Sequence, residues 1–205
     1  YKIGDKMDDF QKHYSNIMPR TGDPKNYEKG YEIVTKHLMK YPCNYILNTR
    51  GLFSMSAKEY EAALKDFTTA ITYADPNAWL YVQRGSIYQS LGDSIKAKTD
   101  FEMAVQLDTV SSTYAFALVH LGKKQQAINV MKAIVAENTE DAGEHYDLAC
   151  LYSLANMKSE SVVALKRAVE LGYKGFHHMQ FDRDLDNIRE EQEYQAGCKQ
   201  QIEEC

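Results

Sequence analysis

Apolar residues recur along the middle of the chain at the spacing of amphipathic helices. In residues 78–107 they stand three or four positions apart in two runs, which the sequence LGD at 91–93 separates. This spacing places them on one side of each of two helices, so the segment is predicted to form a helical hairpin. The residues expected to pack inside it are Leu80, Tyr81, Arg84, Gly85, Ile87, Tyr88 and Leu91 of the first helix and Ile95, Ala97, Phe101, Ala104, Val105 and Leu107 of the second.

The same pattern occurs once more, 34 residues earlier in the chain. Small residues at matching places indicate that two helix backbones approach closely there, and the aromatic residue fills the remaining space. The Arg and Asp, 16 residues apart within each copy, suggest a structural ion pair or a hydrogen bond between the two helices. The six residues that recur are Arg50 and Arg84, Gly51 and Gly85, Ala63 and Ala97, Asp66 and Asp100, Phe67 and Phe101, and Ala70 and Ala104.

A 34-residue period with small, aromatic and Ala positions in this order resembles the tetratricopeptide repeat, whose units are helix-turn-helix hairpins. The resemblance implies an all-α fold: a right-handed superhelical solenoid of such hairpins with a C-terminal capping helix. It also implies a bacterial type of closing segment, since the DRDLDNIR sequence at 182–189 resembles the one that commonly follows bacterial arrays.

The repeat pattern predicts one solenoid domain with four to five hairpins. The third unit is shorter, because Gly122, Ala127 and Met131 follow their counterparts by 30 residues instead of 34. Gly172 is expected to end the last repeat as a C-cap. The expected parts are 1–43, an N-terminal helix and degenerate repeat; 44–77, 78–110, 111–139 and 140–172, four repeats; and 173–205, a closing segment and capping helix.

Composition narrows the function classes. The 205 residues are 44% hydrophobic and 26% charged, which is typical of a globular protein, and the formal charge of −5 argues against a nucleic-acid binder. No apolar run is long enough to span a membrane. The chain begins with Tyr1, so a targeting segment could have been removed before it. The four Cys show no CxxC spacing, which favours a cytoplasmic location and leaves a periplasmic or secreted one open.

Two clusters in the closing segment invite a metal-binding hypothesis. Asp182, Asp184, Asp186 and Glu193 have the spacing of a calcium loop. However, a charged residue stands where such loops carry an aliphatic one, so we expect helix capping by Asp182 or Asp184 instead, with Leu185 and Ile188 packed. The adjacent His177 and His178 would point to opposite sides of an extended segment and could not easily share an ion. We therefore expect no metal and no cofactor.

The sequence also lacks a recognisable catalytic constellation. It has no GxSxG, no Gly-rich phosphate loop and no HExxH. Cys150 and His145 lie on different sides of one predicted helix, and Cys150 is better explained as a small packing residue. We expect that the chain is not an enzyme.

The resemblance implies that the first helices of successive hairpins line a concave groove. Members that grip chaperone tails use a Lys/Asn/Arg clamp there, but the corresponding places hold Asn48 and Leu52, Gln83, and Thr109 and Thr113, so we expect no such clamp. The residues expected to line a peptide-binding groove are Tyr45, Asn48, Leu52, Trp79, Gln83, Ser86, Gln89, Phe116, His120 and Tyr146, with Thr49, Val82, Val119, Cys150 and Ser153 among their neighbours.

These observations favour a non-enzymatic scaffold that binds a peptide or helical segment of another protein. The alternative is a regulatory or assembly module of a larger enzyme or secretion complex. For each aromatic residue of the groove, packing against the preceding hairpin remains open as an alternative to ligand binding.

Overall fold

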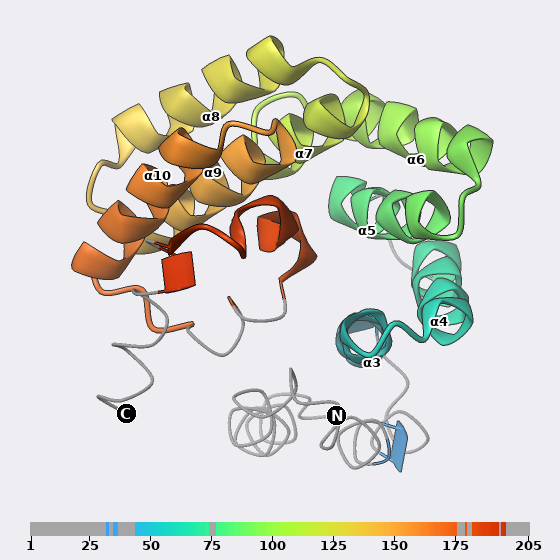
Figure 1. The fold of residues 1–205 in the computed structure, drawn as a ribbon. Helices are drawn as coiled ribbons and strands as arrows, with labels where there is room; N and C mark the ends of the chain where they lie inside the picture. The colour runs from blue at the N-terminus through green and yellow to red at the C-terminus, as the bar shows by residue number, and fades with distance from the viewer. Residues whose placement is uncertain are drawn as a thin grey trace, which may run out of the picture. The chain divides into compact units, whose positions relative to one another are not determined.

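The structure, a computed structural model, is helical throughout the part of the chain that it describes. The described residues are 32, 35–36, 44–73, 77–175, 179, 182–192 and 194–195, and every regular element within them is an α-helix or a 3-10 helix (Figure 1). The predicted all-α class is therefore confirmed. The chain divides into two compact units, residues 1–75 and 76–205.

The first unit contains a hairpin of α3 (Asn44–Ser56) and α4 (Tyr60–Tyr73). The two helices pack closely at Gly51, where an added Cβ would lie 2.8 Å from the buried ring of Phe67. Beside this contact, the Arg50 guanidinium donates two hydrogen bonds to Asp66, of 2.7 and 2.5 Å. The hairpin thus shows why the repeat needs a glycine, an aromatic residue and an Arg–Asp pair together.

Little of the predicted degenerate repeat at 1–43 falls within the described residues. Glu32, Thr35 and Lys36 are helical, and the Thr35 hydroxyl accepts a 3.3 Å hydrogen bond from Arg50 Nη1. The rest of that prediction lies outside the described residues.

The second unit continues with three further hairpins and a short 3-10 helix. The first helices of these hairpins form one layer, in which α5 contacts α7 and α7 contacts α9. Each first helix is paired with the helix that follows it, so α6, α8 and α10 form the second layer. In addition, α6 packs on α7 and α8 packs on α9, so every hairpin is joined to the next. The elements are α5 (Ala78–Ser90), α6 (Ser94–Leu107), α7 (Ser112–His120), α8 (Lys124–Glu137), α9 (Ala142–Leu154), α10 (Lys158–Glu170) and η2 (Arg183–Ile188).

The α5/α6 hairpin repeats the packing of the first unit. A Cβ on Gly85 would lie 2.7 Å from the ring of Phe101, and Ala97 and Ala104 are buried beside it. Arg84 again binds the buried Asp100 carboxylate through two bonds of 2.8 and 2.7 Å. The predicted packing of these positions and the predicted Arg–Asp pair are confirmed in both hairpins.

Not every predicted packing residue is buried. Ile95 is 82% exposed, and Leu91 and Leu107 are 41% and 39% exposed. Ile95 lies in the first turn of α6, Leu107 is its last residue, and Leu91 is the C-cap of α5, so all three lie at helix ends. The prediction was wrong for these residues because helix periodicity says which side a residue faces, but not where along the helix the contact begins and ends.

Each first helix ends in the same left-handed turn. At the end of α5, Gly92 has a φ of 80°, its N–H bonds to the Gln89 carbonyl at 3.1 Å, and the Asp93 N–H bonds to the Tyr88 carbonyl at 2.9 Å. This pair of bonds is the Schellman motif, which satisfies the free carbonyls of the helix end. The motif recurs at Lys58, Gly122 and Asn156, and the predicted C-cap Gly172 ends α10 in the same way.

The closing segment covers the last hairpin with a 3-10 helix instead of beginning as an α-helix. In η2, Asp182 is the N-cap, and its carboxylate accepts a 3.0 Å bond from the Asp184 N–H. Leu185 and Ile188 are fully buried, and η2 contacts both α9 and α10. The predicted capping by Asp182 and packing of the two apolar residues are confirmed.

Candidate functional site

We call the exposed side of α5 and α7, together with the side of α9 that η2 contacts, the first-helix face. Seven of the ten predicted groove residues belong to the second unit, on α5, α7 and α9. Asn48 and Leu52 are half-buried on α3 of the first unit, and the side chain of Tyr45 lies outside the described residues. The residues of the second unit are therefore described together, apart from those of the first.

Uncharged side chains form a row along α5. Trp79, Gln83 and Ser86 are half-buried and Gln89 is exposed, at spacings of three and four residues that keep them on one side of the helix. The side chain of Asn77 accepts a 2.9 Å hydrogen bond from the Trp79 N–H and so fixes the start of this row. On α7, which contacts α5, Phe116 is half-buried. These five side chains retain accessible surface on the face where the groove was predicted.

His120 packs toward the second helices instead. Its ring stacks on Phe101 of α6, with centroids 4.5 Å apart and planes 5° from parallel. Burial lowers the pKa of His120 to about 4, so the ring is neutral near pH 7. His120 was predicted to line the groove, but as the last residue of α7 it has its ring stacked against α6.

Tyr146 is also buried, with 5% of its surface exposed. Its ring stacks on Tyr173 at a centroid distance of 4.3 Å, and its hydroxyl donates a 2.5 Å hydrogen bond to Asp182 Oδ2. Burial is the largest reason why its pKa is raised. Its predicted exposure was wrong because η2 covers this side of α9. Other residues placed beside the groove are buried as well: Thr49, Val82, Val119, Cys150 and Ser153.

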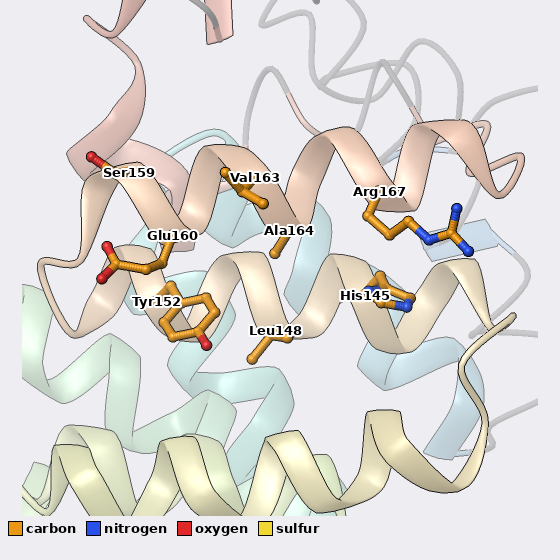
Figure 2. A pocket seen from close by; sticks show the side chains of 8 residues that line it. All are labelled: His145, Leu148, Tyr152, Ser159, Glu160, Val163, Ala164 and Arg167. Carbon is orange, nitrogen blue, oxygen red and sulfur yellow. The ribbon is translucent and has the colours of Figure 1, made fainter.

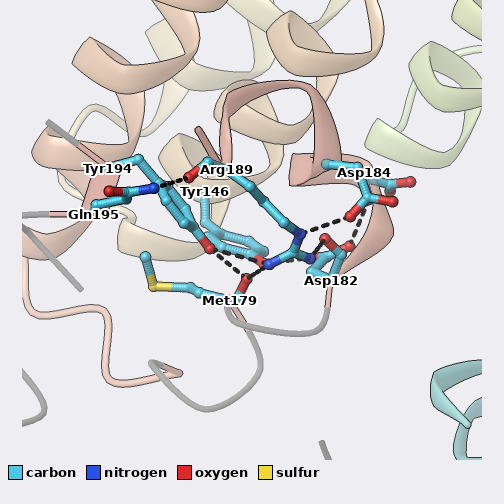
Figure 3. A network of polar contacts seen from close by, with 8 residues as sticks. Tyr146, Met179, Asp182, Asp184, Arg189, Tyr194 and Gln195 are labelled. Atoms are coloured by element: carbon cyan, nitrogen blue, oxygen red, sulfur yellow. Dashed lines mark hydrogen bonds and ion pairs between the residues drawn. The ribbon is translucent and has the colours of Figure 1, made fainter. Parts of the chain in front are cut away.

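The covering segment is held by the polar network in Figure 3. Arg189 donates to the Asp182 carbonyl at 2.6 Å and to the Asp186 carboxylate at 2.7 Å, which folds the segment onto itself. The Tyr194 hydroxyl donates a hydrogen bond to the Met179 carbonyl at 2.8 Å, and this bond joins a residue before η2 to one after it. Sequence reasoning identified the capping Asp182 but not this network, because its members meet only after the segment turns back on α9.

Carboxylates gather where the segment meets α9. The pKa of Asp147 is raised to about 6, first because the group is buried and then because Glu144, Asp182 and Asp141 are also negative, although a hydrogen bond with Ser112 opposes the rise. Within the described ranges, no group of three or more His, Cys, Asp and Glu side chains could hold a metal ion.

A hollow that the sequence did not predict lies between α9 and α10. It has a volume of about 410 Å³, and Leu148, Val163 and Ala164 form its middle (Figure 2). Arg167 and His145 lie at one end and Glu160 at the other. Val163 is 65% exposed although it lies within the apolar run 162–165 of α10, so no distinct sequence signal marks this hollow.

The comparison with known families matches the hairpin that carries the uncharged row. Residues 80–110 match the sequence model of the family described as Tetratricopeptide repeat, and they include most of α5 and all of α6. By this match, the segment is similar to a tetratricopeptide repeat. The matched range contains the Gly85–Phe101 contact and the Arg84–Asp100 pair, so it includes residues that recur at the 34-residue period.

A longer stretch of the chain is similar to a curated protein. Over 127 residues it is 28% identical to the Small glutamine-rich tetratricopeptide repeat-containing protein 2 of Saccharomyces cerevisiae, covering 60% of this chain and 36% of that protein. The chain thus spans about a third of the length of this relative. The shared repeat type supports the tetratricopeptide family for the chain.

The comparison with solved structures gives matches of low TM-score, among them those of MamA and YrrB. The crystal structure of MamA has a TM-score of 0.42 and 17% identity, with 72% of this chain and 89% of that chain covered. The crystal structure of YrrB, called a TPR protein with an unusual peptide-binding site, has a TM-score of 0.43 and 15% identity, with 84% and 88% covered. Among the helices described for this chain, none is long and apolar enough to cross a membrane.

Proposed function

We propose that this chain is a non-enzymatic interaction module that binds a peptide or helical segment of a partner protein on the first-helix face. Tetratricopeptide repeats generally mediate contacts between proteins, which gives the class of function. The observation that carries the proposal is that α5 has one side buried in packing and another side that remains accessible. Leu80, Gly85 and Ile87 are buried in packing, whereas Trp79, Gln83 and Gln89 keep accessible surface.

The chemistry of this row suits a polypeptide partner. Amide side chains such as Gln83 and Gln89 can both donate and accept, as a peptide backbone requires. Trp79 and Phe116 offer aromatic surface, and aromatic anchors carry much of the binding energy at protein interfaces. Because the row on α5 is uncharged, the proposal includes no charged clamp for a carboxylate tail.

The proposal is tested at Trp79. A partner is first isolated by its binding to the purified chain, and its affinity is then measured for the parent, Trp79→Ala and Gln83→Ala. We expect Trp79→Ala to weaken binding by at least about 2 kcal/mol and Gln83→Ala to weaken it less. Lys98→Ala, an exposed change on α6, serves as the matched control and should leave the affinity unchanged.

Melting temperatures of the same variants decide between binding and packing. If Trp79 acts in binding, its substitution should change the melting temperature little. A large loss of melting temperature with unaltered affinity per folded molecule would show that Trp79 is a packing residue, and would overturn its role in the groove.

A further inference from the structure

The closing segment makes contacts with the first-helix face that reach well beyond the last hairpin. We call residues 182–192 the strap. The Arg183 Nη1 atom donates a 2.7 Å hydrogen bond to the Ser90 hydroxyl at the end of α5, a contact across 93 residues of sequence. The Ser90 hydroxyl in turn donates to the Ser86 carbonyl at 2.8 Å, so the strap is tied into the row of predicted binding residues.

At α9 the strap binds much as a peptide ligand would. The Asn187 side chain donates a 2.8 Å hydrogen bond to the Ser153 carbonyl, and the Tyr146 hydroxyl donates to Asp182. Leu185 and Ile188 are fully buried as apolar anchors. These are the two elements of peptide recognition on a helical surface, namely polar bonds to the backbone and apolar side chains in the interface.

The outer end of the strap is fastened to the last hairpin. Lys158, the first residue of α10, forms an ion pair with Glu191 at 2.9 Å. Cys150 lies beneath the strap, 2% exposed, with its Sγ atom 3.7 Å from Asp182 Oδ2. Because the strap contacts α5, α9 and α10, its position depends on the spacing between the second and fourth hairpins.

We infer that the strap is a built-in occupant of the first-helix face: it fixes the spacing between α5 and α9 and replaces α9 on that face, so that a partner segment reaches the face only along α5 and α7. The access of a partner segment along α5 and α7 rests on the proposed function. The two measurements below use no partner, and they can therefore fail while the function proposed for α5 stands, or succeed while it falls.

The first measurement follows the thiol beneath the strap. In the full chain carrying Cys43→Ser, Cys198→Ser and Cys205→Ser, Cys150 is the sole thiol, and its reaction with Ellman's reagent reports opening of the strap. We expect slow labelling in this parent and labelling about tenfold faster or more in Ser90→Ala and in Arg183→Ala, with the helical signal retained, because a hydrogen bond to a charged group is lost. The double variant should be no faster than Arg183→Ala, since both changes remove the same bond.

Lys98→Ala on α6 is the control, and it should label at the parent's rate. Rapid labelling of Cys150 in the folded parent, or labelling rates in Ser90→Ala and Arg183→Ala equal to the parent's, would overturn the inference. Far-UV circular dichroism of each variant shows whether any faster labelling comes from loss of the whole fold.

The second measurement reports the spacing between α5 and the hairpin of α9 and α10. Spin labels are placed at Gln89→Cys on α5 and Ser159→Cys on α10, both exposed positions, in a chain whose four natural Cys are changed to Ser. A single narrow distance distribution is expected, and Arg183→Ala should broaden it. An equally narrow distribution in Arg183→Ala would show that the hairpins alone set the spacing.

Discussion

At the scale of single residues, the packing between paired helices depends on the absence of one side chain. Gly51 and Gly85 each lie against an aromatic ring, and a Cβ at either place would come within 2.8 Å of that ring. Both rings are buried and cannot move away without disturbing neighbours. The repeated glycine is thus required by contact between helices and not by backbone conformation.

We predict that Gly85→Ala destabilises the fold by about 1 to 3 kcal/mol, because the new methyl group overpacks the contact with Phe101. The gain in helix propensity from Gly to Ala, about 1 kcal/mol, acts in the opposite direction and reduces the net loss. Urea denaturation followed by circular dichroism gives the value. Ser86→Ala, one residue along the same helix, is the control, and an unfolding midpoint for Gly85→Ala at or above that control's would contradict the contact.

The half-buried His120 predicts a loss of stability in acid. Its pKa is lowered to about 4 in the folded chain, against about 6.5 when unfolded, so the unfolded chain binds the proton more readily between these values. Stability should therefore fall as the pH drops through this window, by about 1 to 3 kcal/mol. His120→Phe, which retains the stack on Phe101, should lose that part of the pH dependence, as thermal unfolding at pH 7 and pH 4.5 would show.

Asp147 changes stability with pH in the opposite direction. Its folded pKa is raised to about 6, above the unfolded value of about 3.8, so its charge is unfavourable at neutral pH and this penalty disappears as the pH falls toward 4. Asp147→Asn should accordingly raise the melting temperature at pH 7.5 and change it little at pH 4. Equal shifts at both pH values would show that the charge is not the cause.

At the scale of elements, the first helices of the hairpins all end in the same left-handed turn, although different residues occupy its left-handed position. The left-handed position is Gly92 after α5 and Gly122 after α7, but Lys58 after α3 and Asn156 after α9, both with a φ of 63°. A side chain in this conformation costs energy, and Asn tolerates it better than Lys. The turn is therefore set by the helix end and its hydrogen bonds, while the residue in it only adjusts the cost.

We predict that Lys58→Gly stabilises the fold by about 1 kcal/mol and Asn156→Gly by less, since glycine removes the strain at positive φ. The reverse change, Gly92→Ala, should cost about 1 kcal/mol through the backbone alone, because no atom lies within 4 Å of the place where its Cβ would be. Chemical denaturation of the three variants tests the series. A stabilising Gly92→Ala would contradict the left-handed turn.

At the scale of the whole molecule, sequence predicted what is local and missed what is distant. The period of 34 residues anticipated the helical hairpins, the Gly–Phe contact and the Arg–Asp pair, since each lies within one hairpin. It did not anticipate that Tyr146 would be covered, because the covering segment is 36 residues away along the chain. The reach of Arg183 to Ser90 was equally invisible, since no repeat relates these two positions.

The predictions for the candidate site differ in the same way between local and distant contacts. The row on α5 was predicted because its residues are those that hairpin packing leaves over. Tyr146 was expected to be accessible but is covered by the closing segment, which departs from the regular repeat, and the ring of His120 stacks on Phe101 of the preceding hairpin. The repeat pattern thus indicates which residues the packing within a hairpin uses, but not what neighbouring hairpins and the closing segment cover.

The strap also bears on the order in which the protein is made. The hairpins from α5 to α10 are built from neighbouring stretches of sequence and can form as they leave the ribosome, N-terminal elements first. Leu185 and Ile188 are synthesised after all of them, so the side of α9 that these residues bury is bare during that interval. A nascent chain stalled before residue 182 would hold complete hairpins with an uncovered apolar flank, which is the kind of surface that chaperones recognise and that drives aggregation.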